Sequence, residues 1–95
     1  MMSGQAFLPS KEMSFQTVMA DRERLLAYSL SLKKPLMVLD LSQVEQCDSA
    51  GLAFLIEAKR LAHEHSLAFR IEGVTRAVHG LAEFCGVNGI LELDV

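Results

Sequence analysis

The sequence predicts an α/β fold, with a four- to five-stranded, mostly parallel or mixed sheet flanked by three or more helices. The segment from Leu36 to Leu41 is an apolar run closed by the acid Asp40, and it resembles a buried central strand. The segment from Leu67 to Glu72 alternates with a period of two, as a strand covered on one face does. Segments with helical apolar spacing separate these strands, and such crossovers join parallel strands.

The first part of the chain is predicted to hold a short strand and a long helix. Ala6 to Ser10 is a strand candidate that Pro9 weakens, because proline donates no backbone hydrogen bond. Ser14 is a candidate cap for a helix that runs to about Leu32, and Lys33-Lys34-Pro35 ends it. The expected apolar stripe of this helix consists of Phe15, Val18, Met19, Leu25, Leu26 and Leu30.

After the central strand we expect a polar loop, a second helix, a strand and a third helix. The loop covers Gln43 to Asp48, and the second helix runs from Ser49 to Glu64 or His65. Thr75 is the expected cap of the third helix, and Gly86 has the residue type of a C-terminal cap. The third helix should bury one face, made of Val78, Leu81, Ala82 and Cys85, and Ile90 to Leu93 is a candidate last strand.

Composition limits the classes of function. The 95 residues, with 51% hydrophobic and 22% charged residues, predict one folded domain over residues 1–95. A net charge of −3 and the lack of a basic run argue against nucleic-acid binding. We expect no signal peptide, because the N-terminus lacks a charged n-region and a sizeable apolar h-region. We expect no membrane insertion, because no apolar stretch approaches the length of a membrane span. Two cysteines fit free thiols in a reducing cytoplasm.

The chain lacks the usual motifs of catalysis and cofactor binding, such as P-loop, GxGxxG and GxSxG sequences. His63 and His65 lie two residues apart on a helix and so do not face the same way. Acidic neighbours disfavour a thiolate at Cys47. We therefore expect no metal site, no cofactor and no enzymatic activity.

Ser49 stands where a helix is predicted to begin after a strand and a short loop. Partners of α/β sheets commonly dock at this end of the strands, where helix N-termini point. The hydroxyl of Ser49, at or beside the N-cap, can accept a hydrogen bond from a backbone N–H. If exposed it can be phosphorylated instead, although Asp48 would oppose the added negative charge. The residues leave both interpretations open.

The second helix shows an unusual distribution of apolar residues. At about 100° per residue its core face consists of Phe54, Leu55, Ala58, Leu61 and Ala62. Leu52, Ala53 and Ile56 fall on or beside the polar side, so the helix begins apolar all round. Either another segment of the fold covers these residues or a partner protein does.

The run Val38-Leu39-Asp40-Leu41-Ser42, followed by Cys47-Asp48-Ser49-Ala50-Gly51-Leu52-Ala53, resembles the motif of STAS domains. That motif is a strand ending in Asp, a loop, then Asp-Ser/Thr-x-Gly and an apolar helix. The resemblance covers about Ala6 to Leu93 and implies an α/β fold with no enzymatic activity of its own. The family includes MlaB, the small cytoplasmic subunit of the Mla phospholipid-transport ABC transporter, and the anti-sigma factor antagonists.

The resemblance implies that partners dock around the Ser49 loop and the start of the following helix. As a transporter subunit, the protein would bind the ATPase in the cytoplasm. The partner-binding residues would then be Asp48, Ser49, Ala50, Gly51, Leu52, Ala53 and Ile56. In the alternative, an anti-sigma factor kinase binds the unmodified protein and phosphorylates Ser49. The short chain and the Gly51-Leu52-Ala53 run favour the transporter branch, whereas the Asp48-Ser49 pair fits both.

Overall fold

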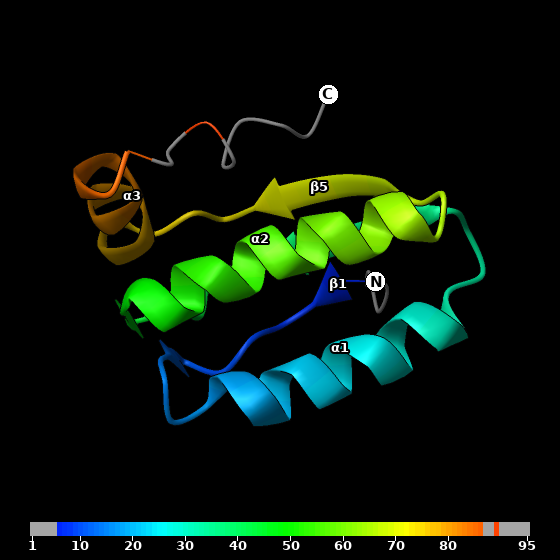
Figure 1. Cartoon of the computed structure of the whole chain (residues 1–95), viewed down its shortest axis with the longest axis horizontal. Coiled ribbons are helices and arrows are strands. Elements are labelled where there is room, and N and C mark those ends of the chain that lie inside the picture. The colour runs from blue at the N-terminus through cyan, green and yellow to red at the C-terminus, as the bar shows by residue number, and fades with distance from the viewer. Residues whose placement is uncertain (1–5, 87–88, 90–95) are drawn as a thin grey trace.

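The computed structural model describes residues 6–86 and 89, which form five short strands and three helices (Figure 1). The predicted α/β class is confirmed. In chain order the elements are β1 (Ala6–Phe7), β2 (Glu12–Met13), α1 (Val18–Ser31), β3 (Leu36–Asp40), β4 (Gln46–Cys47), α2 (Ser49–Glu64), β5 (Ala68–Glu72) and α3 (Arg76–Phe84). The strand predicted at Ile90 to Leu93 lies outside the described residues.

β3 is the central strand of a parallel three-stranded sheet of order β1-β3-β5, as the apolar run predicted. Leu39 pairs with Phe7 on one side and with Ile71 on the other. The predicted strand at Leu67 to Glu72 is also confirmed as β5. Its alternation reflects Ile71 buried between exposed Arg70 and Glu72.

The remaining two strands correct the sequence prediction of one larger sheet. β2 and β4 pair in parallel as a separate two-stranded sheet, with Met13 opposite Cys47. The Glu45 N–H donates to the Lys11 carbonyl, and the Asp48 N–H donates to the Met13 carbonyl at 3.0 Å. The segment Gln43 to Asp48 is therefore not entirely a loop. Strands of two residues are too short to produce a periodic signal.

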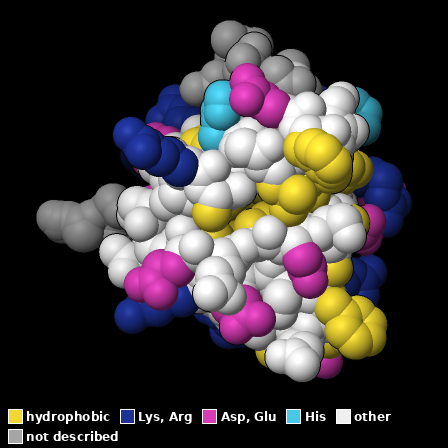
Figure 2. Space-filling view, turned by 90° about the vertical axis from the view of Figure 1, so that its left-hand side faces the viewer, with side chains coloured by type: hydrophobic (Ala, Val, Ile, Leu, Met, Phe, Trp, Pro, Cys, Tyr) yellow, Lys and Arg dark blue, Asp and Glu magenta, His cyan; other side chains and the backbone are white. Residues whose placement is uncertain are grey.

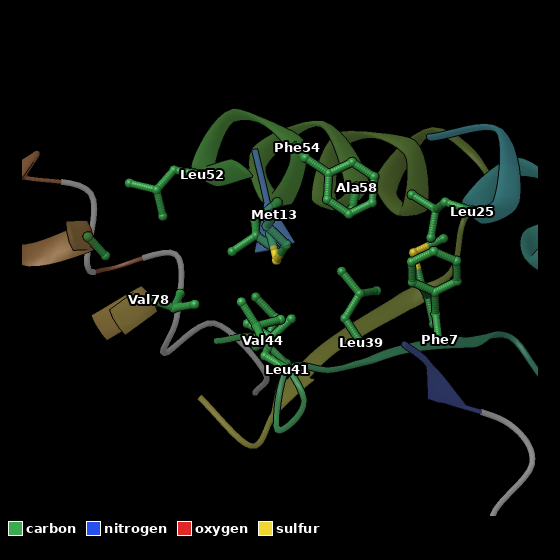
Figure 3. Close-up of a cluster of buried hydrophobic side chains, with 14 of the residues drawn as sticks. Phe7, Met13, Leu25, Leu39, Leu41, Val44, Leu52, Phe54, Ala58 and Val78 are labelled. Carbon is green, nitrogen blue, oxygen red and sulfur yellow. The ribbon is translucent and has the colours of Figure 1, made fainter. Parts of the chain in front are cut away.

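The core lies between the three-stranded sheet and the helices α1 and α2 (Figures 1 and 3). Leu39 of β3 points toward Phe54 and Ala58 of α2, and Leu25 of α1 closes the same cluster. α3 lies at the end of the molecule where α2 begins. The elements thus place the start of α2 at a junction between α3, α1 and the β2–β4 pair.

The start of α1 differs from the prediction. Thr17, not Ser14, is the N-cap residue, and its side chain makes no capping bond to the helix. Ser14 instead belongs to the turn before the helix, where its hydroxyl accepts from the Gln16 N–H and its own N–H donates to the Thr17 hydroxyl. Leu25 is buried, but four residues of the predicted stripe are exposed: Phe15, Met19, Leu26 and Leu30.

A buried acid explains why α1 turns Met19, Leu26 and Leu30 outward. Asp21 is almost fully buried and accepts hydrogen bonds from the Ser10 N–H and hydroxyl, at 3.0 and 2.7 Å. Arg24 donates to the same carboxylate at 2.7 Å and lies over the Phe7 ring. The helix therefore presents Asp21 together with Leu25 to the interior, and the opposite stripe faces solvent.

α2 and α3 begin where the sequence predicted. The Thr75 hydroxyl accepts from the Val78 N–H, which confirms the expected cap of α3, and Val78 and Ala82 are buried. The placement of Cys85 in the core is wrong, because α3 ends at Phe84 and leaves Cys85 exposed at the C-cap. Gly86 follows with a positive φ of 74°, the conformation for which glycine is suited after a helix.

Candidate functional site

Asp48, and not Ser49, caps α2. One carboxylate oxygen of Asp48 accepts from the Gly51 N–H at 3.1 Å, and the other accepts from the Phe15 N–H at 3.1 Å. These backbone donors hold the pKa of Asp48 below its usual value, so the carboxylate is ionised at neutral pH. One exposed side chain therefore joins the first turn of α2 to the turn that precedes α1.

Gly51 allows α2 to sit tightly on the β2–β4 pair. A Cβ at this position would overlap the Met13 carbonyl oxygen and lie 2.8 Å from the Cys47 sulfur. Gly51 is buried, so its contribution to the site is this close approach and not a surface contact. The spacing Asp-Ser-x-Gly thus has a local physical basis: the acid caps the helix and the glycine lets it pack.

Ser49 is the first residue of α2, and its side chain is exposed. The interpretation of Ser49 as the helix cap is wrong, because the neighbouring carboxylate accepts that bond instead. Within residues 6–86 the Ser49 hydroxyl forms no hydrogen bond. The hydroxyl is therefore open to solvent beside an ionised acid.

Leu52 and Ile56 differ in burial. Leu52 is 4% exposed and belongs to the core, which corrects the prediction that it lies outside. Figure 3 shows Leu52 at the end of the core nearest α3, on the same side as Val78. Ile56, one turn later, is 46% exposed, as predicted, and Ala53 is exposed beside it. The outer face of α2 at its start therefore consists of Ser49, Ala53 and Ile56.

A groove between α1 and α2 adjoins this face, and the sequence did not indicate it. Its volume is about 310 Å³. The lining residues are Val18, Met19 and Arg22 of α1 with Ala50, Ala53, Phe54 and Glu57 of α2. The Arg22 guanidinium and the Glu57 carboxylate form an ion pair across the groove, with 3.4 Å between Nη2 and Oε2. The groove brings together residues of α1 and α2 that lie about 30 positions apart in the sequence, which is why no local pattern indicated it. Met19, which the sequence placed on the core side of the first helix, is exposed, so that prediction is wrong.

The end of the molecule where α2 begins carries hydrophobic side chains with acidic side chains among them (Figure 2). Glu12 of β2, Glu45 just before β4, and Asp48 are all exposed. Lys11 is also exposed, and its backbone carbonyl accepts from the Glu45 N–H. The exposed carboxylate next to Ser49 is that of Asp48, and the exposed apolar side chain one to two turns along the same face is that of Ile56.

The side chains near Ser49 are not arranged for nucleophilic chemistry. Burial, the Asp48 charge and the nearby Cys85 raise the pKa of Cys47 to about 11, so its thiol stays protonated at neutral pH. His63 and His65 are exposed near the far end of α2. No cluster of three metal-ligating side chains occurs in the described part of the chain. Among these residues no helix has the length and apolarity to cross a membrane.

A parallel sheet with helices packed on it, and an Asp-capped helix that presents an exposed serine, define a small α/β domain of the STAS type. The family model described as "Mlab, STAS domain" matches residues 12–92, and the chain belongs to this family. Comparison with curated proteins and with solved structures gave no significant match.

Proposed function

We propose that the protein is a non-catalytic accessory subunit of an Mla-type phospholipid-transport ABC transporter, and that it binds the ATPase subunit in the cytoplasm. The observation that carries this proposal is the exposed Ile56 on the outer face of α2, beside Ala53 and Ser49. A large apolar side chain that is exposed beside small side chains on a helix face is typical of a protein–protein interface. Membership of the MlaB-type family agrees with it.

The chemistry around Ser49 favours binding over catalysis. The Asp48 carboxylate already accepts two backbone hydrogen bonds, and its low pKa makes it a poor general base. The high pKa of Cys47 makes its thiol a poor nucleophile. These side chains stabilise the start of α2 and leave the outer face free for a partner.

The test measures affinity for the purified ATPase that is encoded beside the transporter permease. Ser49→Asp should weaken binding tenfold or more, because it fixes a second negative charge beside Asp48 at the contact. The same change should leave the fold intact, since an acid in the first turn suits the helix dipole. Ser31→Asp, at the exposed end of α1, is the matched control. Equal affinities for the two variants would contradict the proposal.

A second candidate is a phosphorylation-switched anti-sigma factor antagonist, with an anti-sigma factor kinase as its partner. The exposed Ser49 hydroxyl, which makes no bond to the described chain, favours it. Incubation with the kinase and ATP should then add one phosphate, detected by intact mass, and Ser49→Ala should remove that addition. Kinase binding without ATPase binding would select this candidate over the transporter subunit.

A further inference from the structure

The outer side of α1 carries a row of exposed apolar side chains. Met19, Leu26 and Leu30 are 66%, 38% and 84% exposed. Their spacings of seven and four residues align them along the helix, on the side opposite buried Asp21. Figure 1 shows α1 along an edge of the molecule. Single exposed apolar residues are common on proteins, whereas a continuous row of them is typical of a contact surface.

Phe15 extends this row by one turn. The Val18 N–H donates to the Ser14 carbonyl at 2.9 Å, so the turn before α1 already follows a helical path. Phe15 is 78% exposed and lies four residues before Met19. Its N–H donates to the Asp48 carboxylate at 3.1 Å, which holds the turn in place. The row therefore extends over about four helical turns in a fixed arrangement.

Two charged residues interrupt the row at its middle. Arg22 and Glu23 are adjacent in the sequence, and both are exposed. Arg22 contacts Glu57 through one nitrogen, Nη2, at 3.4 Å, and its side chain remains 51% exposed. The Glu23 side chain forms no ion pair and no hydrogen bond with the described residues. An occupant of the row must therefore place a cation against Glu23 while it covers the apolar side chains on either side.

A second copy of the chain meets this requirement. We infer that two copies pair through antiparallel α1 helices, about a two-fold axis midway between Arg22 and Glu23. A two-fold contact is self-complementary, so Arg22 of each copy lies opposite Glu23 of the other. The guanidinium has five N–H donors, so Arg22 keeps its contact with Glu57 while it pairs with the second copy. The inference goes beyond the proposed function and does not depend on it.

The same axis also matches the apolar side chains. Met19 then lies opposite Leu26 of the second copy, and Phe15 lies opposite Leu30. An axis two residues further along α1 would pair Met19 with Leu30 but would set Glu23 against Leu26. That arrangement buries a carboxylate against an apolar side chain, which is unfavourable. The charges therefore select the first register.

The size of the contact predicts weak pairing. α1 has 14 residues and is about 21 Å long. A contact one helix wide and of this length buries less than the roughly 1,200 Å² at which stable interfaces begin. We therefore expect a reversible dimer that forms in the upper micromolar range of protein concentration.

Sedimentation velocity on the full chain tests the pairing. The weight-average mass should rise from that of a monomer toward that of a dimer between about 10 μM and about 1 mM. Met19→Asp should raise the dissociation constant of the dimer about tenfold or more, because it places a charge opposite Leu26. Ile56→Asp makes the same kind of change at an exposed residue outside the row and is the matched control. A monomer at every concentration overturns the inference.

Exchanging the two central charges distinguishes a second copy from any other occupant. Arg22→Glu sets carboxylates against each other across the axis, and Glu23→Arg does the same with guanidinium groups. Each single variant should raise the dissociation constant about tenfold or more at low salt. The double variant, Arg22→Glu with Glu23→Arg, restores opposite charges in the same two-fold contact. Its dissociation constant should return to within about threefold of the unmodified value, and failure of this rescue overturns the inference.

The remaining outcomes separate the dimer from a lipid surface and from the proposed function. Flotation with vesicles of phosphatidylglycerol and phosphatidylcholine, lost in Met19→Asp while the protein stays monomeric, would assign the row to lipid and overturn the inference. ATPase binding by a protein that is monomeric at every concentration overturns the inference and leaves the transporter role standing. A dimer that passes the charge exchange, with no ATPase binding, supports the inference and overturns the transporter role alone.

Discussion

Leu52 and Ile56 lie one turn apart on the same side of α2, yet Leu52 is 4% exposed and Ile56 is 46% exposed. The difference arises outside the helix: α3 packs on the start of α2, and Leu52 joins Val78 in one core cluster. An apolar residue on the outer stripe of a helix is therefore core only where a further element reaches it. Where none does, as at Ile56, the residue is available to a partner.

The different burial of Leu52 and Ile56 requires that the first turn of α2 is held in place on the β2–β4 pair. Of the variants considered, Gly51→Val should disturb this packing most. The added side chain would collide with the Met13 backbone and the Cys47 sulfur, so we expect a loss of about 3 kcal/mol or more in the free energy of unfolding. Gly80→Ala is the control, because a Cβ there meets nothing within 4 Å and alanine favours helix. Urea denaturation of both variants measures the contrast. Similar stability in the two variants would contradict the packing role of Gly51.

Leu52→Ala should have the next largest effect. Removing a buried leucine side chain costs about 2–5 kcal/mol, because it loses apolar burial and leaves a cavity. Ile56→Ala should change the free energy of unfolding by under about 0.5 kcal/mol, as surface substitutions do. Equal losses in the two variants would mean that both residues, or neither, belong to the core.

Asp48→Asn tests the cap, with a smaller expected loss. The pKa of Asp48 is lower in the folded state than in the unfolded state, so the ionised carboxylate adds to the free energy of unfolding. This stabilisation is fully present above the ordinary aspartate pKa of about 3.9, and it is lost as the pH falls through the lowered pKa. The wild-type protein should exceed Asp48→Asn in thermal midpoint near pH 7, and this difference should begin to shrink only as the pH falls below about 4. A constant difference from pH 7 to pH 3 would show that the carboxylate charge is not what stabilises the site.

Most of the fold follows from long patterns in the sequence. The apolar run of β3 and the helical spacing of α2 extend over enough residues to define an element and its boundaries. The β2–β4 pair could not be predicted in this way, because its two-residue strands are too short to form a pattern and depend on backbone hydrogen bonds between distant segments. The orientation of α1 depends on Asp21, whose burial requires Ser10 and Arg24 as hydrogen-bond partners.

The site was predictable only in part, for similar reasons. Asp48 and Ser49 are adjacent, and both residue types cap helices well, so the pattern cannot choose between them. The second bond of Asp48, to Phe15, comes from a residue 33 positions away. Ile56 was identified by helical spacing, whereas Leu52 was misplaced because spacing within one helix does not show what a neighbouring helix covers.

The central claim is that α2 presents Ile56 to a partner while it buries Leu52, and one variant tests it most directly. For Ile56→Asp, affinity for the ATPase and the thermal midpoint should be measured on the same preparation, with Leu30→Asp, on exposed Leu30 of α1, as the control. We predict a loss of affinity of tenfold or more, which corresponds to about 1.4 kcal/mol, with an almost unchanged midpoint. A collapsed midpoint would place Ile56 in the core, and an unchanged affinity would place the contact elsewhere on the molecule.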